Sequence, residues 1–273
     1  QEFRELEFPD VPEEVMPEAR IHILSPKSWI KHFPDQLTGC FYSPGFGAIF
    51  IHKSAVSKRE GGVRNLYHIV PEEILHALSD QSFLLDTDKE KTMPVELKIA
   101  RIGYMSERRK ASIKDNDARE YFRGFLEAVT NKMVVEILYK HKEELREEGI
   151  FADHETLLYR RGKKYGHFIA ILDVIIDKIS RFKKEDPAQT WRRFKRGLFT
   201  GDMMMLRDIE RTFGKGSLRF LAQIGSKPDD FPPEEALQKM QRFFETDNTT
   251  ERNEIAKEIM KTPQYKKFRK RRR

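Results

Sequence analysis

The sequence predicts an α+β domain followed by an all-helical module and a basic tail. Two observations separate these parts. The first half of the chain combines short strand-like runs with helical segments, whereas after Pro187 the apolar residues recur only at helical spacing. The last eight residues contain seven Lys or Arg side chains and no acid. We therefore predict boundaries that give residues 1–183, 184–262 and 263–273.

Two segments near the start of the chain have strand patterns. Residues 20–24, Arg-Ile-His-Ile-Leu, alternate between polar and apolar side chains. Residues 39–51 have the composition of a strand, a Pro-Gly turn and a second strand. These segments predict a small sheet in the first domain. The segment from Asp80 to Ile99 is rich in charge, and we predict a solvated linker there.

Residues 71–76, Pro-Glu-Glu-Ile-Leu-His, are one side chain away from the zinc-peptidase pattern His-Glu-x-x-His. On a helix, Glu72 and His76 lie one turn apart on the same face, with Glu73 beside them. Such a pair also occurs on many solvated helices. Its place after the strand-like runs, and about fifty residues before a helical segment that contains Glu127, favours a functional site.

In the order of these elements the chain resembles the gluzincins. These zinc peptidases place a small curled sheet over a helix with His-Glu-x-x-His, and a second helix supplies a Glu ligand, usually within Asn-Glu-Gly-x-Thr-Glu. Residues 126–131, Leu-Glu-Ala-Val-Thr-Asn, match at Glu127 and Thr130 and depart at the flanking Asn and the second Glu. The turn Gly-Cys-Phe-Tyr-x-Pro-Gly is also similar to small bacterial gluzincins. The resemblance covers roughly residues 20–180 and implies a zincin-like first domain.

The resemblance assigns a role to each site residue. It implies Glu72, His76 and Glu127 as metal ligands, Glu73 as general base, and a peptide or protein as substrate. A donor for the tetrahedral oxyanion is also needed. Tyr165 and His167 are the catalytic candidates for that role, and Tyr159 is a further one; packing or helix capping is the competing interpretation of all three.

The exchange of His for Glu at position 72 changes what the site is expected to do. Zinc with two His and one Glu has a net charge of +1, whereas Glu72, His76 and Glu127 make the cluster neutral and weaken the polarisation of water. Oxygen ligands also favour manganese or iron over zinc. If Glu72 binds nothing, the site is degenerate and holds no metal.

Two function classes follow. The first is a gluzincin-like metallopeptidase, or a metal-binding relative with weakened peptide-bond hydrolysis. The alternative is a catalytically inactive zincin scaffold that binds a protein or a nucleic acid. Metal content distinguishes the two classes.

The basic character of the chain is confined to its end. The formal net charge is +7, with 51 Lys and Arg against 44 Asp and Glu. The tail alone accounts for this excess, through Lys266, Lys267, Arg269, Lys270, Arg271, Arg272 and Arg273. Such a block is either a solvated end or a weak, sequence-independent nucleic-acid contact through phosphates.

The sequence contains a single cysteine, Cys40, which excludes an internal disulfide. The strand-like context of Cys40 predicts a small buried residue. We find no apolar run of membrane-spanning length and no signal-peptide pattern, so we expect a soluble cytoplasmic protein without a transmembrane segment. The first residue is Gln, which leaves a removed leader open.

Overall fold

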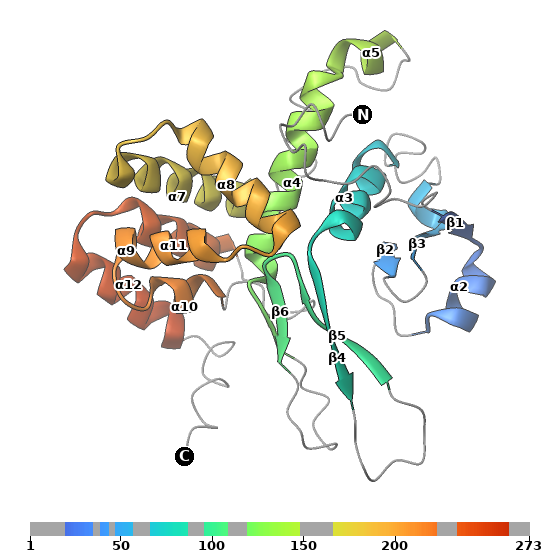
Figure 1. Ribbon diagram of the computed structural model, residues 1–273, viewed down its shortest axis with the longest axis horizontal. Coiled ribbons are helices and arrows are strands. Elements are labelled where there is room, and N and C mark those ends of the chain that lie inside the picture. Colours follow the sequence, from blue (N-terminus) through green and yellow to red (C-terminus); the bar gives the residue numbers. More distant parts are fainter. Residues whose placement is uncertain are drawn as a thin grey trace. The chain divides into compact units, whose positions relative to one another are not determined.

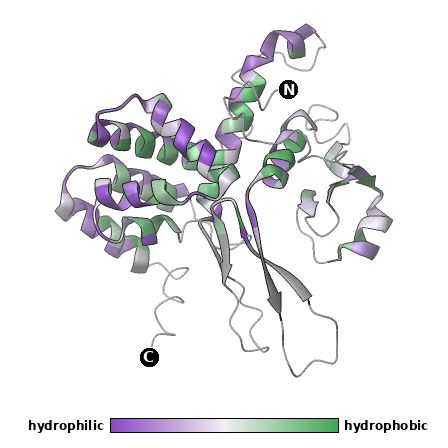
Figure 2. Ribbon diagram, in the orientation of Figure 1, coloured by the Kyte–Doolittle hydropathy of each residue, from purple (hydrophilic) through white to green (hydrophobic). Residues whose placement is uncertain are grey.

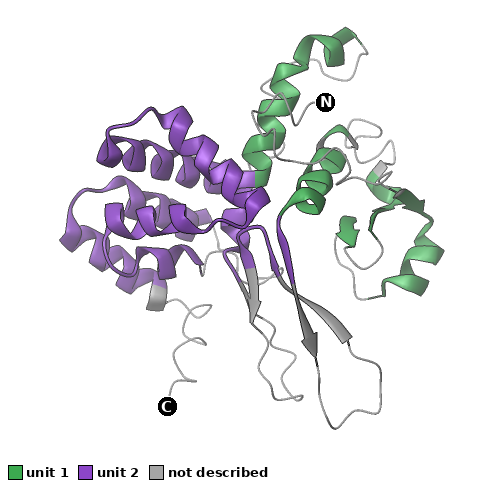
Figure 3. Ribbon diagram, in the orientation of Figure 1, with its two compact units in different colours: residues 1–79, 130–161 green, residues 80–129, 162–273 purple. Residues whose placement is uncertain are grey.

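The computed structural model describes residues 20–34, 39–43, 47–56, 66–86, 96–108, 119–147, 166–222 and 234–261. Within these ranges the chain is a mixed α+β protein rich in helices (Figure 1). It divides into two compact units, which are coloured separately in Figure 3. Unit 1 comprises residues 1–79 and 130–161, and unit 2 comprises residues 80–129 and 162–273. No helix in the described ranges is long and apolar enough to cross a membrane.

Unit 1 contains a three-stranded sheet in the order β1-β3-β2. Its strands are β1 (Arg20–Leu24), β2 (Cys40–Ser43) and β3 (Ala48–His52). Strand β1 is parallel to β3, and β2 is antiparallel to β3. All three strands lie where the sequence predicts them. The predicted Pro-Gly turn falls at residues 44–46, outside the described ranges.

Helix α2 (Pro26–His32) follows β1 and is fixed by local sequence and by aromatic packing. The hydroxyl of Ser25 accepts a hydrogen bond from the backbone N–H of Ser28, which caps the helix start. The buried Trp29 ring contacts Phe41 of β2 edge to face, with ring centroids 5.7 Å apart. Phe33 contacts both Phe41 and Phe50, so aromatic rings join α2 to the sheet. A short 3-10 helix (Lys53–Val56) follows β3.

Helix α3 (Leu66–Leu78) also packs on this sheet, against β2 and β3. It continues through Pro71, although proline removes one backbone donor from a helix interior. Among the side chains of α3 that the structure describes, those of Leu75 and Leu78 are buried. Unit 1 is completed by the greater part of α4 (Arg123–Lys140) and by the short α5 (Lys142–Glu147).

Unit 2 begins with a four-stranded antiparallel sheet in the order β4-β5-β6-β7. Its strands are β4 (Gln81–Asp86), β5 (Glu96–Ile102), β6 (Met105–Arg108) and β7 (Arg119–Tyr121). The prediction of a solvated linker from Asp80 to Ile99 is therefore wrong. Strands β4 and β5 pair over their full length, with a register shift between Ser82 and Phe83.

The helical part of unit 2 contains α7 (His167–Lys183), α8 (Pro187–Thr200), α9 (Met204–Phe213), α10 (Ser217–Ala222), α11 (Glu234–Glu245) and α12 (Thr249–Lys261). These helices contain both hydrophobic and hydrophilic residues, shown in green and purple in Figure 2. Helix α7 buries apolar residues at helical spacing, and α8, α9 and α11 pack on it. The predicted boundary at residue 183 falls between α7 and α8, and residues 262–273 lie outside the described ranges. The three-part division stays a prediction.

Candidate metal centre

Helix α3 supplies the residues of the degenerate zinc-peptidase pattern. Glu72 and His76 are four residues apart in this helix and so lie one turn apart on one face. Glu72, Glu73 and His76 are all half-buried. The helix is held in place by Leu75, which is fully buried and faces away from solvent. The same helix that packs on the sheet therefore presents two of the predicted ligands.

Helix α4 supplies the third predicted ligand. It begins directly after Phe122, a non-glycine residue in the left-handed region with φ of 62°. Glu127 is half-buried and is followed one turn later by Asn131, which is fully buried. Because an α-helix is continuous, Glu127 and Asn131 share one face of α4. The amide nitrogen of Asn131 donates a hydrogen bond to Oε1 of Glu72 at 3.1 Å.

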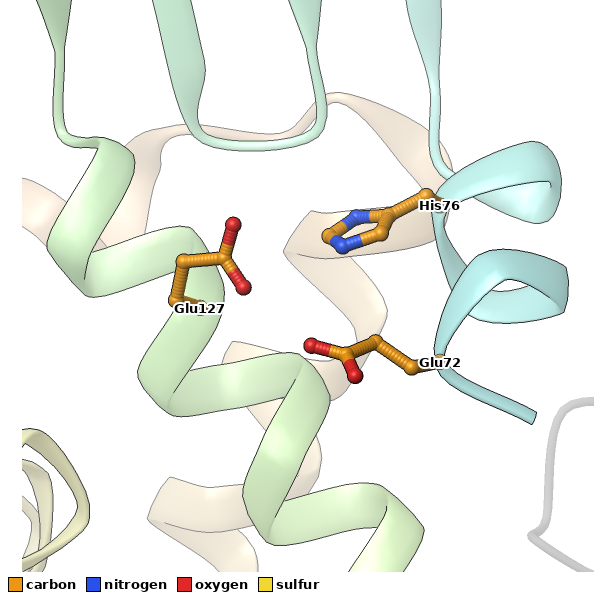
Figure 4. Close-up of side chains that lie close together, drawn as sticks. All are labelled: Glu72, His76 and Glu127. Atoms are coloured by element: carbon orange, nitrogen blue, oxygen red, sulfur yellow. The ribbon is translucent and has the colours of Figure 1, made fainter. Parts of the chain in front are cut away.

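The structure brings Glu72, His76 and Glu127 together (Figure 4). One ligand atom from each side chain can be chosen so that all three lie within 4.8 Å of one another. Two ligands of the same ion, each about 2.1 Å from it, are roughly 3 to 4 Å apart. The upper limit of 4.8 Å on their separations is close to the spacing of ligands around one cation. Two half-buried carboxylates close to each other are also stabilised by a positive charge between them.

The side chain of Glu73 forms a hydrogen bond with the backbone of strand β2. Its Oε2 accepts a hydrogen bond from the backbone N–H of Tyr42 at 2.7 Å, which ties α3 to strand β2. A carboxylate acceptor makes this bond stronger than one between neutral groups. The sequence pattern implies Glu73 as general base, and a general base needs an oxygen within reach of its proton donor. In this structure one of the two carboxylate oxygens is engaged by the sheet.

Cys40 lies beside the same carboxylates and is half-buried, as free cysteine, in β2. Burial raises the pKa of its thiol well above the ordinary value, and the negative charges of Glu73 and Glu72 raise the pKa further. A hydrogen bond to the Glu73 side chain acts in the same direction. The thiol is therefore neutral at physiological pH.

Of the remaining predicted residues, the structure describes His167. His167 begins α7, and its Nε2 lies 3.9 Å from a carboxylate oxygen of Glu234 at the start of α11. Its predicted role as oxyanion donor stays a prediction. Tyr159 and Tyr165 lie outside the described ranges, as do the tail residues Lys266, Lys267, Arg269, Lys270, Arg271, Arg272 and Arg273.

Sequence reasoning did not find two partners of the site. Asn131 appeared only as a departure from the family phrase, although its hydrogen bond to Glu72 gives it a place beside the ligands. The backbone N–H of Tyr42 has no signal in the sequence, because every residue except proline has such a group.

No protein-family model, curated protein or solved structure matches this chain. The relation to the gluzincins is therefore a resemblance in the residues and order of the motifs.

Proposed function

We propose that this chain is a metal-binding relative of the gluzincins with weakened peptide-bond hydrolysis, and that its first domain is zincin-like. In this proposal Glu72, His76 and Glu127 hold one divalent cation. The observation that supports it is the approach of their three ligand atoms to within 4.8 Å of one another. These residues come from two helices, and the sequence pattern selects the same three independently of the structure.

The donor set fits a divalent first-row metal. Imidazole nitrogen suits zinc and iron, and carboxylate oxygen suits manganese, iron and magnesium. Two carboxylates with one imidazole therefore move the preference from zinc toward manganese or iron. When bound, such an ion supplies Lewis acidity toward water and a peptide carbonyl.

The chain's own residues limit the hydrolysis that we expect. Two carboxylate ligands neutralise a dication, whereas one carboxylate and two imidazoles leave a charge of +1. Glu73, the implied general base, has its Oε2 bonded to the Tyr42 N–H, so this oxygen is less available to take a proton from water. Both features reduce the rate of peptide hydrolysis, and neither removes the ability to hold a cation.

The first experiment measures metal content. We expect protein purified without chelator to contain about one divalent metal ion per chain, as measured by elemental analysis. Glu127→Gln keeps the size of the side chain and removes a ligand charge, so the metal content should fall severalfold. Glu254→Gln makes the same exchange on an exposed face of α12 and is the matched control. Metal-free wild type would contradict the proposal.

The second experiment tests why hydrolysis is weak. Glu72→His rebuilds His-Glu-x-x-His and restores the +1 cluster, so zinc affinity should rise and casein cleavage should appear or increase. Adding Glu73→Gln should abolish this cleavage, because the general base is lost. Zinc-loaded Glu72→His without activity would show that the loss extends beyond one ligand. Wild type as active as Glu72→His would show that the charge argument is wrong.

The alternative is an inactive zincin scaffold that binds a protein or a nucleic acid. The hydrogen bond between Glu73 and Tyr42 favours it, because a residue that anchors a strand has a structural role without catalysis. The two proposals differ in metal content, and the nucleic-acid variant of the alternative depends on the basic tail.

A further inference from the structure

Asn131 is the buried polar neighbour of the metal ligands. Its side chain is fully buried in α4, one turn after Glu127 on the same face. Its amide nitrogen donates to Oε1 of Glu72 at 3.1 Å. Both residues belong to unit 1, so this contact is made within one compact unit.

The chemistry of this contact suits a carboxylate at position 72. An amide N–H that donates to one carboxylate oxygen fixes the orientation of the group and leaves the second oxygen for another partner. The amide is neutral, so it adds no negative charge to a site that already contains Glu72 and Glu127. A buried amide also needs a partner, because an unpaired buried donor keeps the full cost of its lost hydration.

A histidine at position 72 would require the opposite chemistry at position 131. An imidazole that binds a metal through one nitrogen donates its other ring N–H, most often to a carboxylate, a carbonyl or water. An acceptor at position 131 therefore suits a histidine, and a donor suits a carboxylate. The side chains found at positions 72 and 131 match each other.

We propose that Asn131 is a positioning residue that orients Glu72 as a metal ligand, and that the pair Glu72 and Asn131 determines which metal the site prefers. The inference rests on the proposed metal site. It adds that Glu72 binds the metal in an oxygen-rich site and that Asn131 orients Glu72 there. The departure from the zinc-peptidase pattern at position 72 therefore changes which metal the site prefers.

The test compares Asn131→Leu in wild type and in Glu72→His, with Mn²⁺ and Zn²⁺ affinities measured by titration of the full chain. Leucine has a similar size and removes the donor without adding charge. In wild type we expect Mn²⁺ affinity to fall about 10- to 100-fold, the usual effect of losing a partner of a ligand. In Glu72→His the same exchange should change Zn²⁺ affinity less than about threefold, because no carboxylate is left to orient.

A second arm replaces the donor with an acceptor. Asn131→Asp combined with Glu72→His should raise Zn²⁺ affinity above that of Glu72→His alone by about tenfold or more, because the ring N–H gains a carboxylate. Asn248→Asp in the same background makes the identical exchange at the exposed start of α12 and is the matched control. This arm remains decisive if Asn131→Leu does not fold.

The outcomes separate the two proposals. Wild type that binds neither metal overturns the proposed function and this inference with it. Wild type that binds Mn²⁺ while Asn131→Leu binds it equally well overturns the inference alone. Equal losses for both metals in both backgrounds would also overturn it, because a merely structural role lowers all affinities together and leaves the metal preference unchanged.

Discussion

The carboxylate of Glu73 accepts a hydrogen bond from the backbone N–H of Tyr42 at 2.7 Å, thirty-one residues earlier in the chain. Tyr42 lies in β2, which among the described residues is an edge strand of the unit 1 sheet and pairs with β3. Edge strands present backbone donors without a strand partner. Glu73 therefore fixes β2 against α3, and a residue expected to act in catalysis also stabilises the fold around the site.

We predict that Glu73→Ala destabilises unit 1 more than Glu73→Gln. Alanine leaves the Tyr42 N–H without its acceptor, which costs about 2 kcal/mol, whereas the glutamine carbonyl still accepts and costs about 1 kcal/mol. The free energy of unfolding is measured in urea through the buried Trp29, in a Trp191→Phe background that leaves it the sole tryptophan. Equal stability of Glu73→Ala and wild type would show that the bond is dispensable.

A related prediction concerns the reactivity of Cys40. Burial and the neighbouring carboxylates keep its pKa high, so little thiolate is present and alkylation by iodoacetamide at pH 8.5 should be slow. Glu73→Gln removes a negative charge, lowers the pKa of Cys40 and should accelerate alkylation severalfold. Mass spectrometry measures the modified fraction, and Glu254→Gln controls for loss of a distant charge. An unchanged rate in Glu73→Gln would contradict this account.

The sequence predicts those elements whose own residues define them. Strands β1 and β3 have local apolar patterns, and α7 buries Phe168, Ile171 and Ile175 at helical spacing. The spacing of Glu72 and His76 likewise identifies a shared helix face from the order of residues alone. In each case the signal lies within one short segment.

The hairpin of β4 and β5 could not be predicted in this way, because distant contacts hold it. The backbone N–H of Asp80 donates to the carbonyl of Leu198, and Arg101 pairs with Asp80 and with the carbonyl of Gly201. Leu198 and Gly201 are about one hundred residues from the hairpin in sequence, so a charge-rich segment resembled a linker. For the same reason Asn131 gave no sign of its contact with Glu72.

The basic tail supports a prediction that concerns nucleic acid. Each phosphate neutralised contributes about 0.7 to 0.9 to the slope of log affinity against log salt, so the seven cations limit the slope to about 5 to 6. Deleting residues 266–273 should remove most nucleic-acid retention. Exchanging the seven Lys and Arg residues for Gln keeps the length and should have the same effect. Retention by either variant would place the contact elsewhere in the chain.

The final prediction uses the buried Tyr104 of unit 2 to test how stability depends on pH. Its hydroxyl donates to the carbonyl of Phe194 at 2.5 Å, and burial, followed by the charge of Asp202, raises the pKa of its phenol. Above pH about 10 an unfolded tyrosine loses its proton while the folded one keeps it. The unfolded state then binds fewer protons, so the stabilising contribution is present below that pH and declines as pH rises.

Tyr104→Phe removes both the hydrogen bond and this titration, and the two effects have opposite consequences at different pH. Near pH 7 the variant should be less stable by about 1 kcal/mol, because the Phe194 carbonyl loses its donor. Above pH about 10 its stability should decline less steeply than that of wild type, and the difference between them should shrink. Urea unfolding followed through the buried Trp191, in a Trp29→Phe background, measures both curves. Other tyrosines and lysines titrate in both proteins and cancel in the comparison. A constant difference from pH 7 to 11 would show that Tyr104 has no part in the alkaline loss of stability.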